Sequence, residues 1–270
     1  MARVEELWRY DGRRAVVTGC ASGIGARVAQ QLNELGAQVI GLDRSPAPGV
    51  SDFHRIDLSD RASIDQAVAS IEGPVDALFN VAGVSSGIGD PLLVVTINFL
   101  GLRHLTEALL PRMPAGSSIV SVSSLAAAAY REHGQQVAPL LRTATMQEGV
   151  RWCESHPDAV GTGYQFSKEA IILYTMRSVV ELGKRGIRIN CTGPGVTETP
   201  ILDQLRTAYG PAYLDDIAKP LGRVSDPDEQ ASVLVFLNSR AASYISGQVV
   251  WVDGGNTGAA TAAALQEGQA

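Results

Sequence analysis

Short apolar runs alternate with amphipathic stretches along this chain of 270 residues. The runs have the length of strands and lie at 14–18, 38–42, 53–56, 75–81, 118–122, 187–190 and 248–252. Stretches of helical character lie between them, at 26–35, 61–71, about 92–110, around Tyr164 and near 227–237. Strands that alternate with helices predict a parallel sheet with helices on both faces. The expected fold class is therefore α/β, with a doubly wound, seven-stranded parallel sheet in one domain that spans residues 1–270.

Two segments interrupt this alternation. Residues 125–163 form an insertion with helical stretches between 137 and 153, and residues 197–220 form a loop with several prolines and glycines. Connections this long in a compact domain are usually lids or binding loops. Both follow the carboxyl ends of strands, where open α/β sheets bind ligands. After Gly255 the chain is rich in Ala, Thr and Gln without a core pattern, which predicts a flexible tail at 256–270.

Composition narrows the class of protein. A content of 45% hydrophobic and 19% charged residues is typical of a soluble globular protein, and the net charge of −6 argues against nucleic acid or an anionic membrane as a partner. The apolar runs are shorter than a membrane span, and the N-terminus has no signal-peptide pattern. Three widely spaced cysteines imply no disulfide framework, which suits a cytoplasmic location. Cys153 and His156 have no second ligand pair at suitable spacing, so we expect no metal site.

A glycine-rich turn follows the first predicted strand. Gly19, Ser22, Gly23, Ile24 and Gly25 belong to a Gly-x-x-x-Gly-x-Gly pattern that opens the first helix. Glycines here permit a tight turn and a close approach of the backbone to a pyrophosphate, which the helix N-terminus stabilises. The strand–turn–helix context therefore predicts a dinucleotide site.

The end of the second predicted strand bears on which dinucleotide binds. Asp43 stands where a carboxylate can accept hydrogen bonds from the adenosine ribose hydroxyls, and it would repel a 2′-phosphate. This favours NAD as the cofactor. Arg44 comes next and could contact a phosphate, so the preference need not be absolute.

Tyr164 and Lys168 are the strongest candidates for chemistry. Side chains four positions apart on a helix lie on one face and can interact. An ammonium beside a phenol favours the phenolate, which provides a proton donor and acceptor near neutral pH. Most such pairs only form a solvated helix face, so a catalytic role for this pair depends on the other motifs in the chain.

Taken as a set, the motifs resemble those of the short-chain dehydrogenase/reductase family, which has a Rossmann fold. The matching segments follow one another in the family's order along nearly the whole chain: 18–25, Asp57, 80–83, Asn98, 123–124, 164–168, Pro194, Gly195, Thr197 and Thr199. The resemblance implies that Tyr164 is the general acid/base and that Ser124, rather than Ser123, orients the reacting oxygen. It implies that Lys168 lowers the tyrosine pKa and binds the nicotinamide ribose, and that Asn98 holds a helix kink and supports a proton relay.

The resemblance also implies cofactor contacts elsewhere in the chain. Asp57 and Leu58 match residues near the adenine, and Asn80, Ala82 and Gly83 match the turn that lines the cofactor. Pro194, Gly195, Thr197 and Thr199 match the segment that contacts the nicotinamide carboxamide. Ser22 replaces the basic residue common in NADP-dependent members, which again favours NAD.

The spacing between Ser124 and Tyr164 departs from most members because of the insertion. In this respect the chain is similar to bacterial 3α-hydroxysteroid dehydrogenase/carbonyl reductases. The implied reaction is NAD-linked interconversion of a secondary alcohol and a ketone, on a small apolar substrate such as a 3α-hydroxysteroid or another cyclic or aryl carbonyl compound. The residues expected to form an apolar pocket are Val84, Leu92, Val137, Leu140, Leu141, Val196, Ile201, Leu202, Leu205 and Tyr209.

Two other functions stay open at this point. A 3-oxoacyl thioester reductase shares the four catalytic residues, but it would prefer NADP and need a basic patch for its carrier. A dinucleotide-binding sensor without catalysis is a further alternative, which the intact catalytic set disfavours. The resemblance also implies a homodimer or homotetramer. Our hypothesis is that the insertion obstructs an interface through the helices of Asn98 and Tyr164 and leaves one near Val249 to Val252.

Overall fold

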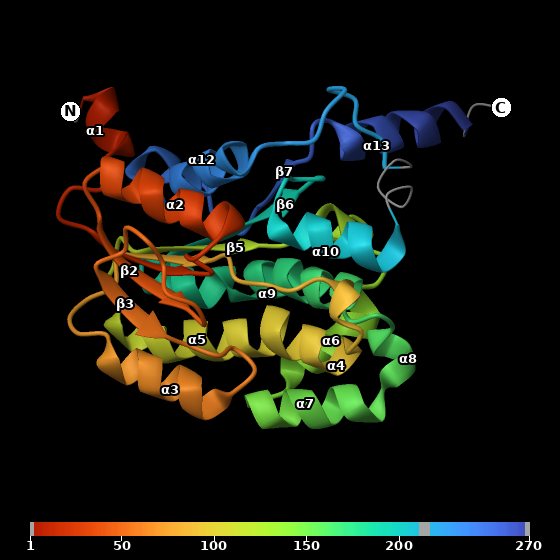
Figure 1. The fold of residues 1–270 in the computed structure, drawn as a ribbon, viewed down its shortest axis with the longest axis horizontal. Helices are drawn as coiled ribbons and strands as arrows, with labels where there is room; N and C mark the ends of the chain where they lie inside the picture. Colours follow the sequence, from red (N-terminus) through yellow and green to blue (C-terminus); the bar gives the residue numbers. More distant parts are fainter. Residues whose placement is uncertain (1–2, 211–216, 268–270) are drawn as a thin grey trace.

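A computed structural model describes residues 3–210 and 217–267 and contains a seven-stranded parallel sheet (Figure 1). The strands lie in the order β3-β2-β1-β4-β5-β6-β7. Their bounds are β1 Arg14–Thr18, β2 Gln38–Asp43, β3 Asp52–Arg55, β4 Ala77–Asn80, β5 Ser118–Val122, β6 Arg188–Pro194 and β7 Val249–Val252. The predicted fold class is confirmed, and the strand order reverses between β1 and β4.

Helices cover both faces of the sheet. The helices are α1 Val4–Trp8, α2 Gly23–Glu34, α3 Arg61–Ser70, α4 Pro91–Val95, α5 Leu102–Leu109, α6 Gly134–Arg142, α7 Met146–Ser155, α8 Pro157–Val160, α9 Tyr164–Lys184, α10 Pro200–Tyr209, α12 Pro227–Asn238 and α13 Asn256–Glu267. In Figure 1, α2 and α12 lie above the sheet, whereas α3, α5 and α9 lie below it.

Alternation along the strands builds one apolar core on each face. In β1, Val16 belongs to the core on the side of α5 and α9, whereas Ala15 and Val17 belong to the core beneath α2 and α12. Neighbouring strand residues point to opposite faces, so a continuous apolar run supplies both cores. This explains why β1, β2 and β4 are recognisable in the sequence as short apolar runs.

The long helix predicted at 92–110 is interrupted by a π-helical turn, η2 (Thr96–Gly101), between α4 and α5. Single π-helical turns within α-helices occur frequently at functional sites. The segment Pro91–Arg112 has the length and composition that could cross a membrane, but 67% of its most apolar window is buried in the protein. Its apolar character is therefore that of a core helix.

The insertion packs against the helices that carry Asn98 and Tyr164. Helix α6 contacts α9, and α7 contacts the π-helical turn η2. Val137 and Leu140 of α6 and Cys153 of α7 are buried in the same core as Ile171 of α9. The insertion thus covers part of the helices that carry Asn98 and Tyr164. Our hypothesis is that this cover prevents two subunits from packing through those helices. The oligomeric state stays a prediction, to be measured as a mass by light scattering.

The tail after Gly255 has a regular backbone conformation, and its flexibility stays a prediction. Residues Asn256–Glu267 form helix α13, which extends from the body of the molecule in Figure 1. Alanine has the highest helix propensity, so the Ala-rich composition accounts for a helix without a buried face. The last three predicted tail residues, 268–270, lie outside the described residues.

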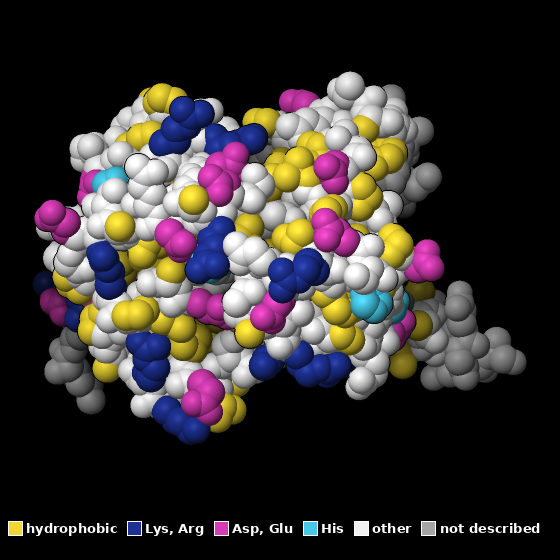
Figure 2. All heavy atoms as spheres, turned by 90° about the horizontal axis from the view of Figure 1, so that it is seen from below, with side chains coloured by type: hydrophobic (Ala, Val, Ile, Leu, Met, Phe, Trp, Pro, Cys, Tyr) yellow, Lys and Arg dark blue, Asp and Glu magenta, His cyan; other side chains and the backbone are white. Residues whose placement is uncertain are grey.

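Charged side chains are distributed over the surface on the side of α3 and α7. Figure 2 shows Lys and Arg interspersed with Asp and Glu on this face, rather than gathered by sign. A polyanion is typically bound by a one-signed basic surface, and this face does not offer one.

Candidate functional site

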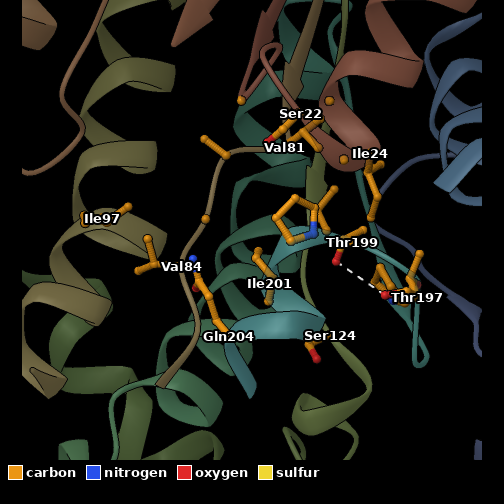
Figure 3. Close-up of a pocket in the computed structure, with 18 of the residues that line it drawn as sticks. Ser22, Ile24, Val81, Val84, Ile97, Ser124, Thr197, Thr199, Ile201 and Gln204 are labelled. Atoms are coloured by element: carbon orange, nitrogen blue, oxygen red, sulfur yellow. Dashed lines mark hydrogen bonds between the residues drawn. The ribbon is translucent and has the colours of Figure 1, made fainter. Parts of the chain in front are cut away.

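A cavity of about 780 Å³ opens at the carboxyl ends of the central strands (Figure 3). Its position at the reversal of strand order is where open α/β sheets bind ligands. The predicted site residues that line it are Gly19, Ser22, Gly23, Ile24, Gly25, Asp43, Arg44, Asp57, Leu58, Ala82, Gly83, Ser124, Tyr164, Lys168, Pro194, Gly195, Thr197 and Thr199. Residues far apart in the sequence therefore meet around one space.

The glycine-rich turn is packed too closely against other backbone to accept side chains at two of its glycines. Gly19 has a φ of +72°, and a Cβ atom there would lie 2.8 Å from the Cα atom of Ala82. A Cβ atom at Gly25 would collide with the carbonyl oxygen of Gly19. The hydroxyl of Thr18 accepts hydrogen bonds from the backbone N–H groups of Val81 (2.9 Å) and Ala82 (3.0 Å), and so joins this turn to the one after β4. The start of α2 is thereby fixed as a cradle suited to a phosphate.

The Asp43 carboxylate lies at the end of β2, in the same cavity. It accepts hydrogen bonds from the backbone N–H groups of Ala21 and Ser45, each at 3.0 Å. Asp43 therefore ties the second strand to the glycine-rich turn while placing a negative charge in the cavity.

Asp57 is held by its own loop. Its Oδ1 atom accepts hydrogen bonds from the backbone N–H group of Ser59 (2.8 Å) and from the Ser59 hydroxyl (2.6 Å). Burial favours the protonated acid, but these hydrogen bonds outweigh it, and the pKa of Asp57 is lowered. The residue lines the cavity as an anion in a fixed orientation.

Tyr164 is the first residue of α9, and Lys168 lies one turn further along. The helix is entered through Gly163, which has a φ of +79° and whose missing Cβ leaves room for the carbonyl oxygen of Pro91. The Lys168 Nζ atom lies 5.7 Å from the centroid of the Tyr164 ring and donates a hydrogen bond to the carbonyl oxygen of Val122 (3.0 Å). The predicted geometry of the pair is therefore present.

Lys168 is a buried cation, with 4% of its surface exposed. Burial lowers its pKa from 10.5 to about 8, because removing an ammonium from water disfavours the charged form. At neutral pH the charged form still predominates. The site thus contains a positive charge in low-dielectric surroundings beside the phenol of Tyr164, where its field is stronger than in water.

The two adjacent serines after β5 have different environments. The Ser123 hydroxyl donates a hydrogen bond to the backbone carbonyl of Lys168 (2.7 Å), and the side chain is buried. Ser124 is half-buried, and its hydroxyl oxygen accepts from the N–H group of Ala126 (3.2 Å). That contact leaves the Ser124 proton to donate, and Figure 3 shows its side chain at the cavity.

This difference gives a testable prediction. We expect Ser124→Ala to lower turnover by about 10²- to 10³-fold, as expected when a donor to a developing oxyanion is removed. Ser123→Ala should cost less, because it removes a contact that supports the backbone of α9 rather than the reacting oxygen. Initial rates of both purified variants provide the measurement. An equal or larger loss in Ser123→Ala would reverse the assignment.

Asn98 and Asn80 do not line the cavity. The Asn98 Oδ1 atom accepts from the N–H group of Val84 (2.8 Å), and its Nδ2 atom donates to the Val84 carbonyl (2.9 Å) and to the Ser167 hydroxyl (3.3 Å). Asn98 therefore holds the turn after β4 against α9 from within the π-helical turn. Its role in a proton relay stays a prediction.

The Asn80 side chain lies in the core rather than in the cavity lining, and its predicted contact with the cofactor stays a prediction. It is 1% exposed and donates to the hydroxyls of Thr106 (3.0 Å) and Ser121 (3.3 Å), within the core. The last residue of a buried strand can point under a neighbouring helix as readily as into the site. Its neighbours Ala82 and Gly83 do line the cavity, so the turn after β4 lies at the cavity although the Asn80 side chain does not.

The predicted apolar pocket is partly correct. Val84, Val196, Ile201, Leu202 and Leu205 line the cavity. The others do not: Val137 and Leu140 are fully buried in the core, Leu92 and Leu141 pack against that core, and Tyr209 is 46% exposed. The apolar face of α6 turns inward onto α9 because the insertion must bury its own hydrophobic residues.

Several lining residues were missed. Ile97 lies in the π-helical turn, and Gln204 of α10 accepts a hydrogen bond through Oε1 from the buried Ser85 hydroxyl (3.3 Å). In the view of Figure 3, Val84, Ile97 and Gln204 lie on one side of Ser124, and Thr197, joined to Thr199 by a hydrogen bond, lies on the other. The amphipathic pattern of 200–209 could have indicated Gln204, but not the contact that orients it.

The chain is similar in sequence and in structure to known dehydrogenases and reductases. Residues 13–136 match a family model described as short chain dehydrogenase, and residues 156–257 match one described as enoyl-(acyl carrier protein) reductase. A coniferyl-alcohol dehydrogenase of Pseudomonas sp. (strain HR199 / DSM 7063) is 38% identical over 90% of this chain and 96% of its own length. A 3-alpha-hydroxysteroid dehydrogenase/carbonyl reductase of Comamonas testosteroni is 32% identical over 89% of this chain and 95% of its own. A crystal structure of the 3-alpha-hydroxysteroid dehydrogenase from Pseudomonas sp. B-0831, complexed with NADH, superimposes with a TM-score of 0.78, at 34% identity over 89% of this chain and 95% of that one.

Proposed function

Because the chain belongs to the short-chain dehydrogenase family, and is therefore an oxidoreductase acting on alcohols and carbonyl compounds, we propose that it uses NAD to interconvert a secondary alcohol and a ketone. The observation that carries the proposal is the convergence of Ser124, Tyr164 and Lys168 on a cavity that continues to the glycine-rich turn. One space thus contains a proton-transfer group and a phosphate cradle.

The residues around the cavity fit a nicotinamide dinucleotide. The glycine turn that lines the cavity at the start of α2 suits the pyrophosphate, and the Asp43 carboxylate suits the adenosine ribose hydroxyls. Lys168 would hold the second ribose. When bound, the nicotinamide supplies the hydride acceptor or donor of the reaction.

The residues of the chain would then manage the proton and the charge on oxygen. The Tyr164 oxygen accepts the hydroxyl proton of the alcohol in oxidation and returns it to the carbonyl oxygen in reduction. Ser124 donates a hydrogen bond to the same oxygen where negative charge develops. The ammonium of Lys168 favours the ionised phenol.

The side of the cavity next to Ser124 favours an apolar, ring-bearing substrate. Val84, Ile97, Ile201 and Leu205 form its wall, with Gln204 as a polar group. The relatives named for coniferyl alcohol and for a 3α-hydroxysteroid both act on ring-bearing alcohols. We propose a substrate of that general shape.

Initial rates with NAD and with NADP, on a panel of a 3α-hydroxysteroid, coniferyl alcohol and a secondary aryl alcohol, test the proposal. We expect turnover with NAD on the 3α-hydroxysteroid or the secondary aryl alcohol. Coniferyl alcohol is a primary alcohol, and turnover on it alone would contradict the assignment to secondary alcohols. Asp43→Asn keeps a hydrogen-bond acceptor but removes the charge, so it should shift the ratio of NAD to NADP efficiency toward NADP by about tenfold or more, because like-charge contact costs several kcal/mol. A wild-type preference for NADP would contradict the cofactor assignment, and no turnover on the panel would contradict the substrate class.

A further inference from the structure

A second cavity of about 430 Å³ adjoins the catalytic one. The two share Leu125, Gly195, Val196 and Ile217 in their linings. Leu125 directly follows the candidate catalytic Ser124, so the border between the cavities begins one residue from the position where the reacting oxygen would lie. A substrate held at Ser124 therefore has two directions in which it can extend.

The second cavity is formed where the end of the sheet meets the segment after residue 217. The Asn256 side chain donates a hydrogen bond to the carbonyl oxygen of Ala218 (2.7 Å), which ties this segment to the start of α13. Pro220 also packs beside Gly255, since its Cβ atom lies within van der Waals distance of a Cβ position built at that glycine. The wall is therefore held by contacts within the chain.

The lining is mostly apolar, and its charged groups have hydrogen-bond partners within the chain, including Asp253, which accepts from the backbone N–H groups of Gly255 and Thr257. Trp251, Val252 and Leu221 contribute apolar surface. Arg223 donates two hydrogen bonds to the Glu229 carboxylate (2.7 and 2.8 Å), and the Lys219 Nζ atom donates to the carbonyl oxygen of Ile217 (3.0 Å). Such a lining favours an uncharged apolar group over a carboxylate or a phosphate-bearing carrier.

Leu221 is an unusual feature of the rim, since 70% of its surface is exposed. A leucine beside an apolar cavity gains free energy when a ligand covers it, because apolar area is removed from water. The residue thus marks the place where an apolar ligand would emerge toward solvent.

We propose that this second cavity is a subsite for the uncharged, apolar part of the substrate distal to the reacting oxygen. The inference rests on the proposed function and extends it: the substrate reaches from Ser124 past Leu125 and Val196 toward Trp251 and Leu221. It therefore has a rigid apolar body longer than one ring. Single-ring alcohols would leave the subsite empty.

A substrate series with one reacting centre and a growing apolar body tests the subsite. The series is cyclohexanol, a decalol and a 3α-hydroxysteroid such as androsterone, measured in the wild type and two variants. Ala218→Trp fills the cavity from an exposed position, and Leu221→Asp introduces a charge at its rim. Leu265→Asp is the matched control, because Leu265 is 67% exposed and lines neither cavity.

We expect both variants to raise KM for the steroid at least about tenfold and to leave cyclohexanol and the kcat values unchanged. The control should behave as the wild type. Equal effects on short and long alcohols, or none on either, would overturn the subsite while the proposed function stands.

Calorimetric binding of the same three compounds, with NADH present, separates the two proposals. Steroid binding that weakens in both variants, without turnover in the wild type, would support the subsite and refute the proposed reaction. A wild type that binds none of the compounds would overturn the subsite directly.

Discussion

Replacing Tyr164 with phenylalanine is expected to lower turnover by about 10²- to 10⁴-fold, the usual contribution of a positioned general acid/base. The change removes one oxygen atom and leaves the ring, which lies near Lys168, in place. The cradle at Gly19 and Gly25 and the Asp43 carboxylate are untouched, so the dinucleotide should bind with nearly the wild-type affinity. The loss should therefore appear in kcat and not in the dissociation constant of the cofactor.

Tyr174 provides a matched control on the same helix. It is 9% exposed, lies edge-on to the ring of Phe99 and does not line the cavity. Tyr174→Phe makes the identical chemical change in the core, so turnover should stay close to that of the wild type. Initial rates and calorimetric NADH binding of both variants provide the comparison. Near-normal turnover in Tyr164→Phe would refute the mechanism, and equal losses in both variants would indicate a general effect on α9.

The sheet and the phosphate cradle were predictable because local chemistry determines both. A buried parallel strand must be apolar on both sides, and Val16 with its neighbours shows this directly in the sequence. Gly19 and Gly25 are required by the path of the backbone itself, since any side chain there would collide with it. Signals of this kind do not depend on distant parts of the chain.

Other parts of the site depend on tertiary contacts that leave no local signal. Whether Asn80 points into the cavity or under α5 is decided by the hydroxyls of Thr106 and Ser121, which belong to other elements. The apolar residues of α6 resemble a pocket wall in sequence, but they pack onto α9. The second cavity likewise joins segments around Leu125, Leu221 and Trp251, and only the fold brings these together.

The tail shows what the hydrophobic pattern does and does not determine. A lack of apolar pattern at 256–270 correctly indicates that the described part of this segment adds nothing to the core, since residues 258–266 are exposed. It does not indicate the backbone conformation. The Asp253 carboxylate accepts hydrogen bonds from the N–H groups of Gly255 (2.9 Å) and Thr257 (2.8 Å), and these contacts, together with the helix propensity of alanine, favour a helix start there.

Lys168→Met is expected to change how stability depends on pH. Burial lowers the pKa of Lys168 to about 8, whereas a lysine in the unfolded chain titrates near 10.5. Between these values the unfolded chain binds more protons than the folded one, so the contribution of Lys168 to the free energy of unfolding rises with pH. The shift corresponds to a difference on the order of 3 kcal/mol between pH 7 and pH 11. Methionine has a stem of similar length and no proton to lose, so the variant should lack this rise.

The comparison must be made as a difference between the two proteins. Burial raises the pKa of Cys20, Cys153 and Cys191 to about 12, so these thiols keep their protons in the folded chain after the unfolded chain has lost them. Their contribution lowers stability as pH rises above about 9, opposite in sign to that of Lys168. It is common to wild type and variant and cancels in the difference. The lost hydrogen bond to the Val122 carbonyl costs about 1 kcal/mol, independent of pH over this range.

Urea unfolding of both proteins at several pH values from 7 to 11 provides the measurement. We expect the free energy of unfolding of the variant, relative to that of the wild type, to be greatest at pH 7. It should fall by about 3 kcal/mol as the pH rises through 8 toward 10.5. Turnover should be lost in the same variant, because the ammonium beside Tyr164 is gone. A residue that costs stability when charged, and whose removal costs activity, is retained for the reaction rather than for the fold. Parallel pH curves for the two proteins would mean that Lys168 does not titrate near 8, and they would contradict the conclusion that its buried charge costs stability.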